Sequence, residues 1–138
     1  MENNDFFYQG EEEMKGKVTI KSFDGCLEFS VEFLDTVTSK LIQKHLPLES
    51  TVNLWGDEIY FDTTIEVEPD DLTKNVSVGD LAYWPQGRCL CIFFGPTPAS
   101  TASQPVPASE VALIGKVTVS KEKLRAIRIG SKISLRCD

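Results

Sequence analysis

The sequence is poor in positive charge. It carries 14 Lys and Arg residues against 21 Asp and Glu residues, which gives a net charge of −7 at pH 7. Proteins that bind nucleic acid or dock on anionic membranes normally present a basic patch or stripe. We therefore expect neither a nucleic acid nor a membrane among the partners of this chain.

Long hydrophobic runs are also missing. No apolar stretch approaches the roughly 18 residues that would span a bilayer. The N-terminus begins Met-Glu-Asn-Asn-Asp, which has the wrong charge and polarity for a signal peptide. The sequence therefore predicts a cytoplasmic protein, and its 138 residues correspond to about one domain.

The sequence also lacks cysteine and histidine residues at the spacings that are typical of metal sites. The cysteines are Cys26, Cys89, Cys91 and Cys137, without a CxxC pair, and the one histidine is His45. Zinc sites combine such ligands at short, regular spacings. We expect no metal and no cofactor, and we expect Cys89 and Cys91 to lie on one face of a strand as small buried residues.

The first 13 residues differ from the rest of the chain. They are acidic and show no hydrophobic period, although they contain three aromatic residues. A segment without an apolar face has nothing to dock with. We expect residues 1–13 to form a disordered extension and residues 14–138 to form the folded domain.

A period of two dominates the start of that domain. Val18 and Ile20 alternate with polar residues, and the alternation resumes from Leu27 to Phe33 after Asp24-Gly25. This pattern is typical of strands with one buried face, and Asp-Gly is a common hairpin turn. The sequence predicts a β-hairpin here.

The period then becomes helical. Apolar residues at helical spacing follow the hairpin, with Asp35 as the expected N-cap and Pro47 as the stop: Leu34, Val37, Leu41 and Ile42. We expect one main amphipathic helix of roughly three turns, with Leu41 at the centre of its apolar stripe. A short second helix is expected after Ser120.

The rest of the chain reads as short strands separated by Gly and Pro turns. The exception is the Pro-, Ala-, Ser- and Thr-rich segment 97–109, which we expect to be a mobile loop or flap. Many short strands with one or two helices indicate a mainly β protein built as a closed barrel.

Three motifs resemble a small prokaryotic cyclophilin-like family of unknown function. The first is Leu54–Phe61, the second runs from Val78 to Gly87 and on through Cys91–Pro98, and the third is Ile114–Val117. Their order and spacing agree with the family from about Met14 to the C-terminus. The resemblance implies a closed eight-stranded cyclophilin-like β-barrel.

The likeness to true peptidyl-prolyl isomerases is thinner. Phe93 and Phe94 match the phenylalanines of those enzymes, but the strand that carries their catalytic arginine aligns near Glu58–Phe61, where no arginine stands. Arg88 is the only arginine before Phe94. The resemblance therefore implies a divergent relative with little or no isomerase activity, and a divergent isomerase is the alternative.

Candidate site residues concentrate in the first two motifs. Several aromatic residues form either a groove for a peptide or small-molecule ligand or the barrel core: Trp55, Tyr60, Tyr83, Trp84, Phe93 and Phe94. Glu58 shares a strand face with Tyr60, which makes it available to such a groove. Arg88 either lies over Tyr83 or Trp84, binds an anionic ligand end, or is simply exposed.

Overall fold

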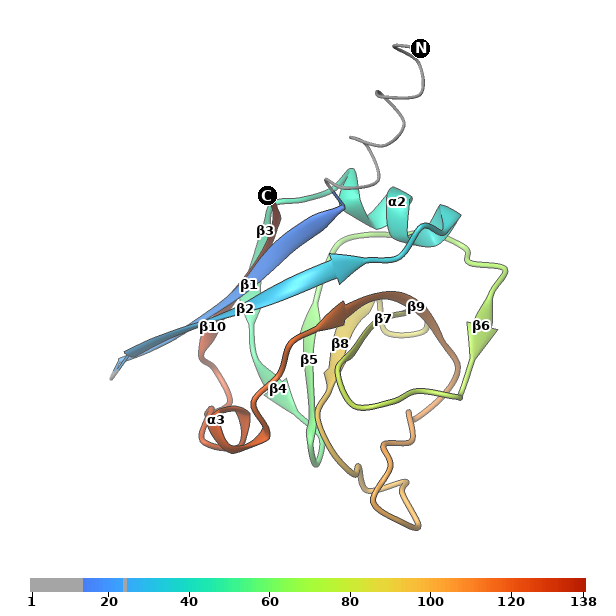
Figure 1. The fold of residues 1–138 in the computed structure, drawn as a ribbon. Coiled ribbons are helices and arrows are strands. Elements are labelled where there is room, and N and C mark those ends of the chain that lie inside the picture. The colour runs from blue at the N-terminus through green and yellow to red at the C-terminus, as the bar shows by residue number, and fades with distance from the viewer. Residues whose placement is uncertain (1–13, 24) are drawn as a thin grey trace, which may run out of the picture.

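The computed structural model describes residues 14–23 and 25–138 (Figure 1). The N-terminal extension expected over residues 1–13 lies outside the described residues, as does Asp24 of the predicted hairpin turn. In the described ranges, no helix is long and apolar enough to cross a bilayer.

Ten strands form one antiparallel sheet in the described part of the chain. They are β1 (Lys15–Ser22), β2 (Gly25–Phe33), β3 (Leu48–Thr51), β4 (Asn53–Leu54), β5 (Glu58–Asp62), β6 (Leu72–Thr73), β7 (Asp80–Trp84), β8 (Cys89–Phe93), β9 (Val111–Val117) and β10 (Lys132–Cys137). The resemblance implies eight strands. The described chain has ten because two short strands of two residues each are added, β4 paired with β5 and β6 paired with β9.

The sheet curls into a nearly closed barrel, which confirms the predicted fold class. The strand order is β3-β10-β1-β2-β9-β7-β8-β5-β4, with β6 paired to β9. β3 at one end of this order contacts β5 near the other end. The Ser50 hydroxyl donates to the Asp62 carbonyl at 2.8 Å across that junction, so the two ends are joined without a full ladder.

The predicted hairpin is confirmed. β1 and β2 pair in register from Lys15 opposite Glu32 to Ser22 opposite Gly25. Their alternating apolar residues point into the core, where Val18 and Ile20 are almost fully buried. The outward residues between them are polar, as a sheet with one wet face requires.

The main helix, α2 (Val37–Gln43), differs from the expectation in its cap and its buried face. Thr36, rather than Asp35, is the N-cap and accepts a hydrogen bond from the Ser39 N–H. Leu41 is 37% exposed, so its expected place at the centre of the apolar stripe is wrong, whereas Ile42 is fully buried. The helix has seven residues, which is about two turns rather than three.

A buried hydroxyl explains this difference. The Ser39 hydroxyl donates to the Ile114 carbonyl of β9 at 2.8 Å and is fully buried. This bond turns the face that contains Ser39 and Ile42 toward the barrel, and Leu41 therefore points away. Asp35 instead pairs with Lys40 at 2.8 Å on the surface. Apolar spacing alone could not show that a serine lies at the centre of the buried face.

The short second helix is confirmed as α3 (Lys121–Arg125). Ser120 caps it by accepting from the Lys123 N–H, and Leu124 packs into the core. Figure 1 shows α2 and α3 on opposite sides of the barrel.

Four strands bury side chains on both faces. The inner face of β5, β7, β8 and β9 contributes residues such as Phe61, Tyr83 and Leu90 to the main core. The outer face contributes a second, smaller cluster that includes Ala82, Cys91, Phe93 and Val111. Something must therefore cover the outer face of these strands, and the segment between β8 and β9 partly does so.

Candidate functional site

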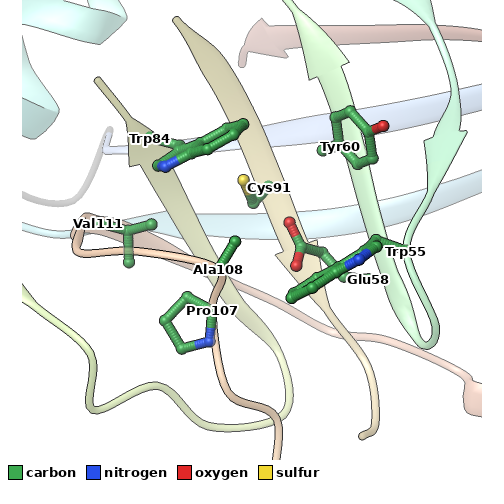
Figure 2. A pocket seen from close by; sticks show the side chains of 8 residues that line it. All are labelled: Trp55, Glu58, Tyr60, Trp84, Cys91, Pro107, Ala108 and Val111. Atoms are coloured by element: carbon green, nitrogen blue, oxygen red, sulfur yellow. The ribbon is translucent and has the colours of Figure 1, made fainter. Parts of the chain in front are cut away.

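A pocket of about 230 Å³ lies on the outer face of the barrel, over β5, β7, β8 and β9 (Figure 2). We call it the outer pocket. Its lining comes from strand positions in β5, β7, β8 and β9, from the turn after β4 and from the segment before β9: Trp55, Glu58, Tyr60, Trp84, Cys91, Pro107, Ala108 and Val111.

Strand alternation places Glu58 and Tyr60 in this pocket. In β5, Ile59 and Phe61 are fully buried in the main core. Their neighbours Glu58 and Tyr60 therefore face outward together, as strand geometry requires. Cys91 of β8 lies directly opposite Tyr60 in the ladder, which brings its thiol beside the Glu58 carboxyl group.

Hydrogen bonds hold the ring of Trp84 at the edge of the pocket. Its indole N–H donates to the Ser109 hydroxyl, which in turn donates to Gln86 Oε1 at 2.9 Å. The ring also packs on Gly87, where an added Cβ would lie 2.5 Å from Trp84 Cζ3. Trp84 thereby links the turn between β7 and β8 to the segment that carries Pro107 and Ala108.

The segment expected to be a loop or flap contains no strand or helix and covers one side of the outer pocket. Its own polar side chains shape it. The Thr97 hydroxyl donates to the Val106 carbonyl, and the Ser100 hydroxyl donates to the Gln104 carbonyl at 2.7 Å. These bonds bring Pro107 and Ala108 back over the sheet.

The turn between β4 and β5 sets the position of Trp55. Gly56 has φ +62°, a left-handed conformation that favours glycine. The next residue, Asp57, donates its backbone N–H to the Pro96 carbonyl at 2.9 Å and pairs its carboxylate with Arg125 at 2.8 Å. Asp57 therefore fastens this turn to neighbouring segments, while the adjacent Glu58 faces the pocket.

We expect Gly56→Ala to destabilise the protein by about 1–3 kcal/mol, because a side chain there is strained. The added Cβ would also lie 2.8 Å from Pro98 Cδ and 2.9 Å from Thr97 Cα. Gly130→Ala is the control for strain alone, since it has φ +93° and open space around it. Urea unfolding should rank Gly56→Ala below Gly130→Ala in stability, and equal values would contradict the proposed close packing of the turn.

The Glu58 carboxyl group has an unusual environment. The residue is only 6% exposed, and its Oε1 is buried without a hydrogen-bond partner among residues 14–23 and 25–138. Burial raises the pKa of Glu58 from 4.5 to about 7, and a hydrogen bond from the Cys91 thiol offsets part of this rise. At neutral pH the group therefore exists in both protonation states.

Cys91 cannot serve as a thiolate in this setting. Burial, followed by the charge of Glu58, raises the pKa of Cys91 well above its ordinary value. Since the thiolate is the nucleophilic form of cysteine, the neutral Cys91 thiol is unreactive. Nor does any group of three His, Cys, Asp or Glu side chains in the described ranges gather in a way that could hold a metal ion.

Four of the eight candidate residues lie outside the outer pocket. Tyr83 points to the opposite face from Trp84, where its hydroxyl donates to the Ile65 carbonyl at 2.7 Å. Phe93 and Phe94 are buried in the two clusters. Arg88 is exposed and pairs with Glu66 at 2.7 Å, and within the described residues it makes no cation–π contact with Tyr83 or Trp84.

The other four candidates, Trp55, Glu58, Tyr60 and Trp84, line the pocket together. The remaining lining residues are not among the candidates: Cys91, Pro107, Ala108 and Val111. Cys91 could have been found by pairing the strand of Cys89–Phe93 with the strand of Glu58. No pattern in the sequence marks Pro107 and Ala108, because their place depends on how the segment before β9 folds back. Val111 reaches the pocket through the pairing of β9 with β7.

Comparisons with known proteins agree with this architecture. A family model described as cyclophilin-like matches residues 17–136. The solution structure of a hypothetical protein from Archaeoglobus fulgidus is similar, with 34% sequence identity and a TM-score of 0.74, covering 91% of this chain and 95% of that one. A search of curated proteins found none that matches the chain.

Proposed function

This chain belongs to the cyclophilin-like family, and from that premise we propose that its outer pocket binds a small organic molecule or a short peptide segment, with little or no prolyl isomerase activity. One observation carries the proposal. A buried carboxyl oxygen without a partner among the described residues lies in a pocket walled by aromatic side chains. Buried polar groups normally have hydrogen-bond partners, so such an atom is an open position for a ligand.

The composition of the outer pocket supports binding. Ligand sites are mostly apolar, with a few polar groups that fix the orientation of the ligand. Here Trp55, Trp84 and Pro107 provide the apolar walls, and Glu58 provides a polar group on β5, where it pairs with Phe93 of β8. A volume of about 230 Å³ suits a compact group such as a small ring or one amino-acid side chain.

The charges around the pocket support weak or absent isomerase activity. Proline isomerisation is accelerated by a donor aimed at the imide nitrogen, because it weakens the partial double bond. In the described chain, no Arg or Lys lines the pocket, and Arg88 is paired with Glu66 outside it. A pocket that holds a proline ring without such a donor binds ground and transition states equally, which does not accelerate the reaction.

We expect a standard proline-peptide assay to show turnover at least about 100-fold slower than that of true cyclophilins, since losing one such donor costs about that much. The Arg88→Ala variant should show the same rate as the wild type. Robust wild-type turnover that falls in Arg88→Ala would contradict this proposal and favour a divergent isomerase.

Binding itself is tested by nuclear magnetic resonance with a library of small organic fragments and short peptides. Ligands should shift the signals of Trp55, Tyr60 and Trp84. Ala108→Phe should abolish these shifts, because an exposed alanine at the pocket is replaced by a ring that fills it. Ala102→Phe in the same segment is the matched control, since Ala102 is exposed and does not line the pocket. Shifts that persist in Ala108→Phe, or a library without any binder, would contradict the proposal.

A further inference from the structure

We propose that the outer pocket recognises an organic ammonium group, which donates a hydrogen bond to Glu58 Oε1 and lies against the faces of Trp55 and Trp84. This inference rests on the proposed function and names the chemical class of its ligand. The ammonium group belongs either to a small amine or to a lysine side chain of a peptide, and the chemistry of recognition is the same for both.

The first argument is that one oxygen of the Glu58 carboxyl group has no hydrogen-bond partner. Glu58 Oε1 is buried and accepts no hydrogen bond from the described residues, and Figure 2 shows the carboxyl group among the side chains that line the pocket. The thiol that bonds to the group, that of Cys91, is a weak donor. An ammonium group supplies both a strong donor and the opposite charge, and charge-assisted hydrogen bonds are about twice as strong as neutral ones.

The second argument is the arrangement of the rings. Figure 2 shows Trp55 and Trp84 on either side of the Glu58 carboxyl group, with Tyr60 nearby. The faces of aromatic rings carry partial negative charge and attract cations, tryptophan most strongly. A cation in this pocket would therefore be held by a carboxylate and by two indole faces at once.

The third argument is the absence of any competing positive charge. Within the described residues, no Lys, Arg or His lines the outer pocket. The nearby acidic residues Asp57 and Asp80 have ion pairs with Arg125 and Lys116, whereas Glu58 has none in the described ranges. The titratable groups on the same face as Glu58 are Tyr60 and Asp62 on its own strand and the thiols of Cys89 and Cys91 on β8, and none of them is cationic.

The protonation of Glu58 separates a cationic ligand from a neutral one. Its raised pKa means that the empty pocket is partly protonated near neutral pH. An ammonium ligand requires the ionised carboxylate, so its binding below pH 7 releases a proton and strengthens as the pH rises. A neutral ligand that accepts a hydrogen bond from the protonated carboxyl group would show the opposite trend.

Isothermal titration calorimetry with n-butylammonium and n-butanol tests the inference. The two probes have similar shapes and differ in charge. We expect butylammonium to bind the wild type at least about tenfold more tightly, since an unscreened charge pair contributes more than about 1.4 kcal/mol. Titrations in buffers of different ionisation enthalpy should reveal proton release on binding at pH values below 7.

Variants and a peptide complete the test. Glu58→Gln should weaken butylammonium binding by about tenfold or more, whereas Asp62→Asn, on the same strand and face but outside the pocket, should leave it unchanged. Should Glu58→Gln fail to fold, proton release by the wild type still decides the question. A further titration with acetyl-Gly-Lys-Gly-amide distinguishes the two possible ligands. Tighter binding of this peptide than of butylammonium indicates a lysine side chain of a peptide partner, and weaker binding indicates a small amine.

Equal affinity for the alcohol and the amine, unchanged amine binding in Glu58→Gln or the absence of proton release would each overturn the inference. These outcomes leave the proposed function standing if fragments still bind in a way that Ala108→Phe blocks. If neither fragments nor amines bind, the proposed function and the inference both fail.

Discussion

The Glu58→Gln variant should gain about 3 kcal/mol of unfolding free energy relative to the wild type as the pH rises from 4.5 to above about 7. Burial raises the pKa of Glu58 over this range, and each tenfold change in proton affinity corresponds to about 1.4 kcal/mol. Glutamine has nearly the same shape and does not ionise. The difference between the two proteins therefore isolates the charge of one carboxyl group.

The sign follows from proton binding. Between pH 4.5 and about 7 the folded protein keeps the Glu58 proton and the unfolded chain has lost it. The folded state thus binds more protons, and its stability falls as the pH rises. The contribution of the protonated group is fully present below pH 4.5 and is lost once the pH exceeds the folded pKa. Urea unfolding at a series of pH values measures it, and parallel curves for the two proteins would show that Glu58 is solvated.

Ile42→Ala should lower the free energy of unfolding by about 2–5 kcal/mol, whereas Leu41→Ala should lower it by less than about 1 kcal/mol. The two residues are adjacent in α2, but Ile42 is fully buried in the main core and Leu41 is 37% exposed. Removing a buried side chain loses its burial and leaves a cavity, and both penalties are smaller for a side chain that already contacts water.

Both substitutions raise the helix propensity at their position, because each introduces alanine, the best helix former. Their difference therefore reports the direction in which α2 faces. Chemical denaturation of the two variants is sufficient to measure it. A larger loss in Leu41→Ala than in Ile42→Ala would show that the helix is rotated, with Leu41 against the barrel.

The strands are largely predictable because strand alternation is a local property. The run from Leu27 to Phe33 buries every second residue, and its sequence shows that alternation directly. The direction of α2 is not predictable in the same way. It depends on the bond between Ser39 and the Ile114 carbonyl, whose partners are 75 positions apart in the chain.

The candidate site is predictable only in part, for a related reason. Alternation assigns Glu58 and Tyr60 to one face because β5 has polar residues among its apolar ones. In β7 and β8 both faces are apolar. Alternation therefore puts Tyr83 and Trp84 on opposite faces without showing which of the two reaches the pocket, and it does not show that Phe93, on the same face as Trp84, is buried. The pairing of strands, rather than their composition, decides which aromatic residues reach the pocket.

β5 and β8 bury side chains on both faces, so alternate residues of one strand serve either the core or the outer pocket. Ile59 and Phe61 hold the barrel together, and the alternate residues Glu58 and Tyr60 line a cavity that the barrel does not need in order to close. Changes confined to the second set therefore alter what the surface recognises without opening a void in the core. This barrel is suited to acquiring new binding preferences while its scaffold stays constant.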